Sequence, residues 1–308
     1  MKQYSAYHLQ ILSEIRLPGY TEVVSEISNV SNSVVEIYIR HITKSASKED
    51  HENDNILIGE APSVLNCRIE DGRKIIVNPN PDADFDFVRS VVGGELMAAL
   101  LRQRGYLVLH GACLSKNDIA FGIVGYSGWG KSTTAGYFLN AGYQLLGEDL
   151  LVVDVTQPTP TVLPGPQGLR LRPDAASWLR YDDKRGEKIY NATRKRIYSI
   201  GKTDNHSIPL GKIYLLEGEG RQSNSILSMS GIDIMMELVK HTRNMKWLND
   251  QSFLRAHFNQ CSTLINKVPV AMLQRKRSLD SLPEIKELIE EDLRKEIDQR
   301  IIPDVVEV

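Results

Sequence analysis

The chain has few cysteines, no long apolar run and almost no net charge over its 308 residues. Its three cysteines (Cys67, Cys113 and Cys261) lie far apart without a C-x-x-C pair, which favours buried thiols in a reducing compartment. The seven histidines show no metal-ligand spacing with one another or with the cysteines. The sequence therefore predicts neither a disulfide scaffold nor a cysteine- or histidine-rich metal site.

Charge and hydropathy exclude further classes of protein. No apolar run approaches the roughly 20 residues that cross a bilayer, and the charged N-terminus lacks the apolar core of a secretory signal. The net charge is −2, so nothing indicates nucleic acid or an anionic membrane as a partner. Since 42% of the residues are hydrophobic, we expect an ordinary globular protein of the cytoplasm, with no nucleic-acid and no membrane partner.

What the chain does contain is a phosphate-binding motif. Residues 125–132 read Gly-Tyr-Ser-Gly-Trp-Gly-Lys-Ser and match G-x-x-x-x-G-K-[ST] at every fixed position. The apolar run 119–124 predicts a buried strand before the loop, and residues 131–141 predict a helix that ends at Gly142. A dinucleotide site is disfavoured, because the third glycine of G-x-G-x-x-G would fall at Thr133. The alternative is a glycine-rich turn between a strand and a helix.

Backbone N–H groups in such a loop wrap a phosphate, and the helix N-terminus adds positive potential. Lys131 is expected to reach the β- and γ-phosphates, and the Ser132 hydroxyl is expected to bind Mg²⁺. The motif therefore predicts ATP and Mg²⁺ as ligands, without deciding whether other phosphoryl donors serve. The residues expected to contact the nucleotide are Gly125, Ser127, Gly128, Gly130, Lys131, Ser132 and Thr133.

Two adjacent carboxylates, Glu148 and Asp149, end the predicted strand that follows the loop and its helix. In a parallel sheet with right-handed crossovers the ends of these strands meet at one edge. One acid could hold Mg²⁺ while the other takes the proton of an acceptor hydroxyl. The alternatives are a polar turn at this point, or a Walker B strand over residues 150–153 that would make Asp154 the metal ligand.

The chain divides into two predicted parts. Residues 1–85 form a small β-rich unit, in which 67–70 and 73–77 pair as a hairpin, and residues 86–308 form an α/β core with a C-terminal helix. Residues 87–104 predict a helix despite Gly93-Gly94. The polar residues 44–55 predict an exposed loop. The C-terminal helix has one largely apolar face, which predicts that the helix packs on the core. The alternative is that this face makes a subunit contact in a homo-oligomer.

A basic stretch spans residues 182–205, where seven Lys and Arg residues stand against four acids. It predicts either a substrate-facing loop or a solvated surface. Upstream, residues 107–111 predict a buried strand that ends in His110-Gly111. A histidine at a strand end is usually structural, but this one precedes the phosphate loop by one hairpin, so a place near the phosphates is the alternative.

The chain resembles the HPr kinase/phosphorylase family in four features and in their order. These features are His110-Gly111, the loop 125–132, Gly142 and Glu148-Asp149. The resemblance is specific over residues 107–152 and faint elsewhere. It implies an α/β, P-loop-containing core of the HPr kinase or phosphoenolpyruvate carboxykinase type. It also implies a kinase in which Glu148 is the catalytic base, Asp149 binds the metal with Ser132, and His110 lies beside the phosphates; Asp154 then has no catalytic role.

Two departures from the family pattern bear on the acceptor. The acid pair is Glu-Asp where the family usually has Asp-Asp, and the later R-G-x-G signature is absent, which puts HPr in doubt as the substrate. The candidates for an assisting arginine are Arg170, Arg172, Arg194 and Arg196.

The chain looks more like the HPr kinase-like proteins found beside peptide natural-product genes, including lasso-peptide clusters. Some of those proteins phosphorylate a serine of the precursor peptide. The resemblance thus implies transfer of the ATP γ-phosphate to a Ser or Thr hydroxyl of a precursor peptide. A kinase for a small hydroxyl compound such as free serine, and a non-catalytic nucleotide-binding regulatory protein, are the alternatives.

Overall fold

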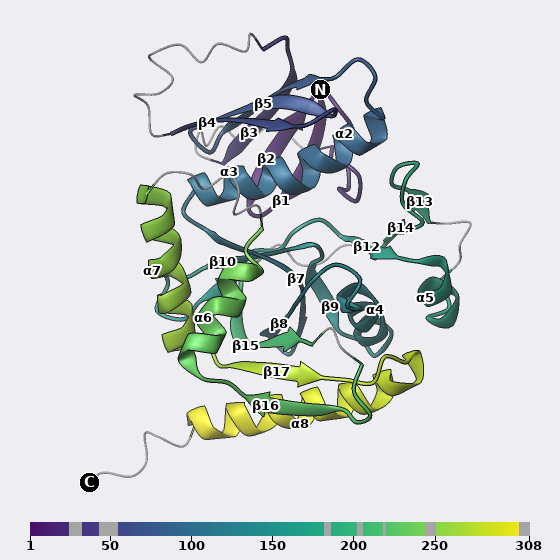
Figure 1. Ribbon diagram of the computed structural model, residues 1–308, viewed down its shortest axis with the longest axis vertical. Coiled ribbons are helices and arrows are strands. Elements are labelled where there is room, and N and C mark those ends of the chain that lie inside the picture. The colour runs from purple at the N-terminus through teal and green to yellow at the C-terminus, as the bar shows by residue number, and fades with distance from the viewer. Residues whose placement is uncertain are drawn as a thin grey trace.

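The computed structural model combines two large β-sheets with helices between and around them, which makes the protein a mixed α/β protein (Figure 1). The polar segment 44–55 lies outside the described residues except for Asn55, and so do 182–185 and 202–205 of the basic stretch. The structure describes residues 1–24, 33–42, 55–181, 186–201, 206–217, 220–243 and 251–301.

The first sheet lies in the N-terminal part, as predicted. Its hairpin turns at Asp71 and Gly72, whose φ angles are +52° and +61°, and the Arg73 N–H donates to the Glu70 carbonyl at 2.9 Å. Side chains alternate between the core and solvent, as Val35 and Ile37 illustrate. In spatial order the strands are β1 (Lys2–Ala6), β2 (Leu9–Ser13), β3 (Val34–Ile39), β6 (Lys74–Pro79), β5 (Leu65–Glu70) and β4 (Ile56–Ala61).

A long helical segment lies between this sheet and the second one (Figure 1). It consists of α2 (Phe85–Val91), the π-helical turn η1 (Val92–Leu96) and α3 (Met97–Gln103), so the predicted helix is confirmed. Gly93 and Gly94 lie within the π-helical turn. The segment shares one hydrophobic core with the N-terminal sheet, and the predicted division of the chain at residue 85 stays a prediction.

The second sheet carries the phosphate-loop motif. It has eight strands, in the order β11 (Thr161–Val162), β10 (Leu150–Asp154), β7 (Leu107–Lys116), β8 (Ile119–Val124), β15 (Ile208–Leu216), β17 (Val270–Gln274) and β16 (Ser225–Ser228), with β9 (Gln144–Gly147) also paired to β7. β8, β15 and β17 are mutually parallel, whereas β8, β9 and β10 all run antiparallel to β7. The sheet is therefore mixed.

Two sequence-based expectations need correction here. β7 does not end at His110-Gly111 but continues to Lys116, because Ala112, Cys113 and Leu114 extend the buried apolar run. The expected parallel sheet is also wrong for this part of the sheet, since β7 lies between β8 and β9 and is antiparallel to both. β8 and β9 still point the same way, so their carboxyl ends do meet at one edge.

The remaining elements surround the second sheet. α8 packs on it through Ile285 and Ile289, both fully buried, and through a hydrogen bond of 2.7 Å from the Tyr214 hydroxyl to Asp292. The predicted packing helix is thus confirmed. None of the described helices has the length and apolarity needed to cross a membrane. These elements are α4 (Lys131–Asn140), α5 (Pro173–Trp178), α6 (Gly231–Lys240), α7 (Gln251–Lys267), η4 (Leu279–Ser281), α8 (Leu282–Ile301), and a three-stranded sheet of β12 (Gly168–Leu171), β14 (Arg196–Ser199) and β13 (Glu187–Lys188).

Candidate functional site

The sheet opens at the middle of β7, where the neighbours on both of its edges change. On one edge, β8 leaves the ladder at Val124, opposite Gly111, and enters the phosphate loop. On the other edge, β9 ends at Gly147 and β10 begins at Leu150, opposite His110. Crevices of this kind, at the carboxyl ends of strands where the strand order changes, are the usual ligand sites of α/β proteins.

A segment from a distant part of the chain fills the edge that β8 vacates. The His110 N–H donates to the His241 carbonyl at 2.7 Å, and Leu109 forms an antiparallel bridge with Thr242. This pairing brings Arg243, two residues after the His241 cap of α6, to the middle of β7. The opening therefore receives side chains from segments that lie far apart in the sequence.

The phosphate-loop motif lies between β8 and α4, so its predicted strand and helix are confirmed. Gly128 and Gly130 have φ angles of +85° and +94°, which L side chains rarely adopt, and this explains glycine at both positions. Gly142 follows α4 with φ +85°, as expected of a glycine after a helix C-terminus.

A cleft of about 250 Å³ lies between the loop, β7 and the three-stranded sheet. Of the predicted nucleotide contacts, all but Gly125 line it. Gly125 is buried behind the loop, and its carbonyl accepts a hydrogen bond from Lys131. The lining residues are Ser90, His110, Gly111, Ala112, Ser127, Gly128, Gly130, Lys131, Ser132, Thr133, Glu148, Asp149, Arg170, Arg172, Ile189, Tyr190, Thr193, Lys195 and Arg243.

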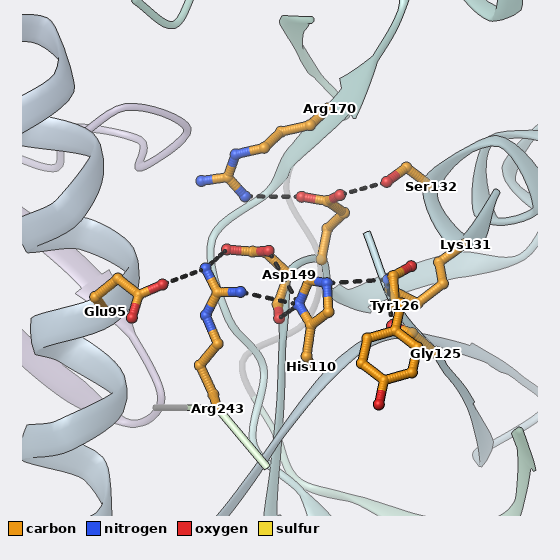
Figure 2. A network of polar contacts seen from close by, with 10 residues as sticks. Glu95, His110, Gly125, Tyr126, Lys131, Ser132, Asp149, Arg170 and Arg243 are labelled. Atoms are coloured by element: carbon orange, nitrogen blue, oxygen red, sulfur yellow. Dashed lines mark hydrogen bonds and ion pairs between the residues drawn. The ribbon is translucent and has the colours of Figure 1, made fainter. Parts of the chain in front are cut away.

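Lys131 is held inside the loop and joined to His110 (Figure 2). Its Nζ donates to the carbonyls of Gly125 and Tyr126, at 2.6 and 2.8 Å, and to His110 Nε2 at 3.0 Å. Burial lowers the pKa of Lys131 to about 8, although the charges of Asp149 and Glu148 oppose this shift. The other ring nitrogen of His110, Nδ1, faces Asp149.

Glu148 is buried at the entrance of α4 and contacts the loop directly. Its Oε1 accepts from the Ser132 hydroxyl at 2.6 Å, and its Oε2 pairs with Arg170 Nη1 at 2.7 Å. Glu148 and Asp149 raise the pKa of Arg170 although burial lowers it, so this guanidinium is a fixed positive charge. The family resemblance implies that Ser132 binds the metal with Asp149, whereas in the structure the Ser132 hydroxyl contacts Glu148.

Asp149 faces the other side of the cleft. Its Oδ2 lies 3.2 Å from Arg243 Nη2, and its Oδ1 lies 3.3 Å from His110 Nδ1 (Figure 2). Burial raises the pKa of Asp149, but Arg243, His110 and Arg170 outweigh it and hold the pKa well below 3.8. The φ angle of Asp149 is +74°, a conformation that turns the two carboxylates toward different partners.

Two charged residues of this network, Arg243 and Glu95, are not among the site residues that the sequence predicts. Arg243 Nη2 also pairs with Glu95 at 2.9 Å, and Glu95 belongs to the π-helical turn η1 (Figure 2). A Cβ on Gly94 would lie 3.6 Å from Asp149 Oδ2, so this turn of the helix is in contact distance of the carboxylate. π-Helical turns occur often at functional sites. Gly93-Gly94 inside a predicted helix was the one local signal of this arrangement.

Asp154 lies outside the cleft. Its Oδ1 accepts from the Thr156 N–H and hydroxyl, at 2.9 and 2.6 Å, and its Oδ2 accepts from Gln157 at 3.1 Å. These bonds hold the pKa of Asp154 below its usual value although burial raises it. Asp154 therefore stabilises the turn after β10.

Of the four candidate arginines, Arg170 and Arg172 line the cleft, while Arg194 is exposed and does not. Arg196 donates to the Gly186 carbonyl at 3.0 Å, so it holds the neighbouring segment. From the basic stretch 182–205, Lys195 is the cationic side chain that lines the cleft among the described residues.

Arg172 and Lys195 both line the cleft, and each is the chain neighbour of a residue in the pair that ends the small sheet, Leu171 with Arg196. In the described part of the chain no carboxylate pairs with either side chain. Two cationic side chains that line one cleft without a carboxylate partner favour the binding of an anion there.

The segment that carries Arg243 is held from behind by α7. The Thr242 hydroxyl lies 2.7 Å from His257 Nε2, and His257 is almost fully buried beside Cys261. Burial lowers the pKa of His257 to about 4.

The protein is therefore expected to lose stability as the pH is lowered from about 6.5 to about 4. Over this range His257 binds a proton in the unfolded protein but not in the folded protein. Urea unfolding at about pH 7 and about pH 5 measures this loss. His257→Gln should reduce the loss, and His206→Gln, at an exposed histidine, should not. An equal pH dependence in all three proteins would contradict the assignment.

Within the described residues, no group of three or more His, Cys, Asp or Glu side chains is placed to hold a metal ion. A Mg²⁺ ion that binds together with a nucleotide needs fewer protein ligands, since phosphate and water oxygens supply the others. The adjacent oxygens of Ser132 and Glu148 fit that requirement. A comparison with models of known protein families finds no match, and a comparison with curated proteins finds none either.

Proposed function

We propose that the protein is an ATP- and Mg²⁺-dependent kinase that transfers the γ-phosphate to a hydroxyl group, as the resemblance to HPr kinases implies. The observation that carries the proposal is the meeting of the phosphate loop with two carboxylates in one cleft, where Ser132 contacts Glu148 at 2.6 Å. Phosphoryl transfer needs a phosphate cradle, a metal holder and a residue that orients the acceptor. The cleft contains a candidate for each role.

The contacts favour a division of roles between the acids that differs from the one the family resemblance implies. Mg²⁺, when bound, would neutralise charge on the phosphates, and Ser132 with Glu148 would hold it. Asp149, oriented by His110 and Arg243, is then the group that faces the acceptor. Arg170 keeps Glu148 ionised and in place.

In this scheme the acceptor hydroxyl oxygen attacks the γ-phosphorus, and the bond to the oxygen that bridges the β- and γ-phosphorus atoms breaks. The hydroxyl proton passes to Asp149, and ADP leaves with the electron pair of the broken bond. Lys131 and Arg243, which both line the cleft, would supply positive charge to the phosphates. Since the transition state is loose, Asp149 serves chiefly to orient the hydroxyl, which a carboxylate of low pKa can do.

The shape of the cleft bears on the choice between a peptide and a small acceptor. The segment before β14 reaches across to α2. There the ring centroids of Tyr190 and Phe87 lie 4.8 Å apart, and the Asn191 N–H donates to Asp84 at 3.2 Å. This bridge closes one side of the cleft. It favours an acceptor that enters by one end, either the end of a precursor peptide or a small hydroxyl compound such as free serine, over the middle of a long peptide.

We expect Arg172 and Lys195 to hold an anionic group of the acceptor. The apparent KM for the acceptor should then rise with salt, because charges at an open cleft are screened over about 8–10 Å at physiological ionic strength. Neutralising both residues as Arg172→Gln with Lys195→Gln should mimic high salt, with little change in ATP affinity. Arg194→Gln, on the exposed neighbour, is the matched control. A rise in the ATP dissociation constant with an unchanged acceptor KM would assign the pair to the nucleotide instead.

The test of the proposal is transfer itself. The protein is incubated with ATP and Mg²⁺ and with HPr, free serine or serine-bearing precursor peptides in turn. We expect phosphate on a peptide serine. Transfer to free serine alone would select the small-molecule alternative, and rapid transfer to HPr alone would exclude both. ATP binding without any transfer would leave a nucleotide-binding regulatory protein, against which the paired carboxylates argue.

A further inference from the structure

Arg275 lies directly behind the phosphate loop, although 144 residues separate it from Lys131. It follows β17, which is parallel to β15, and β15 is parallel to β8. The carboxyl ends of the three strands therefore meet at the edge where the loop begins. This topology brings a guanidinium to the loop that no local motif announces.

The contact between Arg275 and the loop is close and specific. Arg275 Nη2 donates to the carbonyl of Trp129. A Cβ on Gly130 would overlap the guanidinium, lying 3.0 Å from its Cζ and closer still to Nη2. The φ angle of +94° favours glycine at position 130, and the absence of a side chain there leaves the space that the guanidinium occupies.

The guanidinium of Arg275 is buried, and its charge has no counter-ion among the described residues. The side chain is 8% exposed, and its Nε is buried without a hydrogen-bond partner. In the described part of the chain no carboxylate pairs with it. Burial and the nearby Arg277 lower its pKa. A buried charge without a partner is costly to a fold, so a ligand that brings negative charge to the loop would offset this cost.

The planarity of the peptide bond indicates what the contact does. In a trans peptide the carbonyl and the following N–H point in opposite directions. Because Arg275 holds the Trp129 carbonyl on the rear of the loop, the N–H of Gly130 points to the front, where Gly130 lines the cleft. This N–H is one of the donors that such loops aim at a phosphate.

We propose that Arg275 is a positioning residue of the phosphate site: it orients the Gly130 N–H toward a bound phosphate and supplies fixed positive charge behind it. This inference rests on the proposed nucleotide site and assigns it a residue outside the loop motif. Arg275 lies behind the loop and is not among the residues that line the cleft. Its effect is therefore on phosphate binding rather than on the acceptor.

The experiment measures the binding of inorganic pyrophosphate and of Mg²⁺-bound ADP by calorimetry. Arg275→Gln is expected to weaken both by about 10- to 100-fold, the usual effect of losing a charged hydrogen-bond donor. Arg275→Lys keeps the charge without the planar fork, so its affinity for both ligands should lie between those of the unchanged protein and Arg275→Gln. Arg277→Gln, at an exposed arginine two residues away, is the matched control and should change affinity less than about twofold.

An amide spectrum separates positioning from a merely structural role. In the unchanged protein and in Arg277→Gln, the Gly130 N–H resonance should move downfield when pyrophosphate binds, and in Arg275→Gln it should not. If Arg275→Gln does not fold, Arg275→Lys carries the test. Pyrophosphate affinity in the Arg275 variants equal to that of Arg277→Gln would refute the inference while leaving the nucleotide site intact. Failure of the unchanged protein to bind either ligand would refute both.

Discussion

Replacing Lys131 with methionine is expected to weaken ATP binding by at least about 100-fold, because each charged hydrogen bond to phosphate contributes about 1.5–3 kcal/mol. The side chain is already placed for this role, since its Nζ lies between two loop carbonyls and His110. Methionine keeps the apolar stem and removes the charge. ATP affinity measured by calorimetry in the presence of Mg²⁺ checks the expectation.

The melting temperature of the free Lys131→Met protein should change little. Lys131 is 7% exposed, so the substitution removes a buried ammonium along with its bonds. Removal of a buried charge stabilises the protein, whereas loss of its hydrogen bonds destabilises it, so the two effects oppose each other. Lys188→Met is the matched control, because Lys188 is exposed and bonds to Asn191 at 2.6 Å. Equal ATP affinity in the two variants would show that the loop does not bind the nucleotide phosphates.

The second large effect separates the two carboxylates. Asp149→Asn is expected to bind Mg²⁺-ATP normally and to lose transfer by about 10²- to 10⁴-fold, the usual cost of removing a group that accepts the acceptor proton. Glu148→Gln should also lose transfer, but by weakening ATP binding in the presence of Mg²⁺ and leaving it unchanged without the metal. Titrations of ATP with and without Mg²⁺, beside single-turnover rates, distinguish the two variants.

Asp154→Asn is the control for this pair, because Asp154 ends β10, the strand that begins just after the two acids, and its side chain bonds only to its own turn in the described structure. It should retain transfer. Should Asp149→Asn weaken the metal dependence while Glu148→Gln binds Mg²⁺-ATP normally, the roles implied by the family resemblance would be restored. An inactive Asp154→Asn beside an active Glu148→Gln would favour the Walker B interpretation.

The sequence predicts the loop region well because every signal there is local. The apolar run 119–124, the glycines with positive φ at 128, 130 and 142, and the helix after Lys131 all depend on neighbouring residues. The same holds for the turn at Asp71-Gly72 and the long helix 85–103. Local sterics and hydrophobic periodicity suffice to fix such elements.

What the sequence could not provide is the set of side chains that meet from distant segments. Arg243 reaches Asp149 because residues 241–243 take the edge of β7 that β8 vacates, and Glu95 of η1 pairs with Arg243 from the other side. Arg275 arrives through the parallel order of β8, β15 and β17. The predicted end of β7 was wrong for a related reason, since a histidine and a glycine inside a strand resemble a strand end until its neighbours are known.

The most direct test of the central claim is a ³¹P spectrum recorded over time on the protein with ATP, Mg²⁺ and a serine-bearing precursor peptide. One spectrum follows ATP, ADP, inorganic phosphate and any new phosphate ester together. A transferase cleft built from the phosphate loop, Glu148 and Asp149 predicts a phosphomonoester signal that grows in step with ADP and disappears in Asp149→Asn. Inorganic phosphate growing in step with ADP, or a spectrum of ATP that does not change with any hydroxyl acceptor, would contradict it.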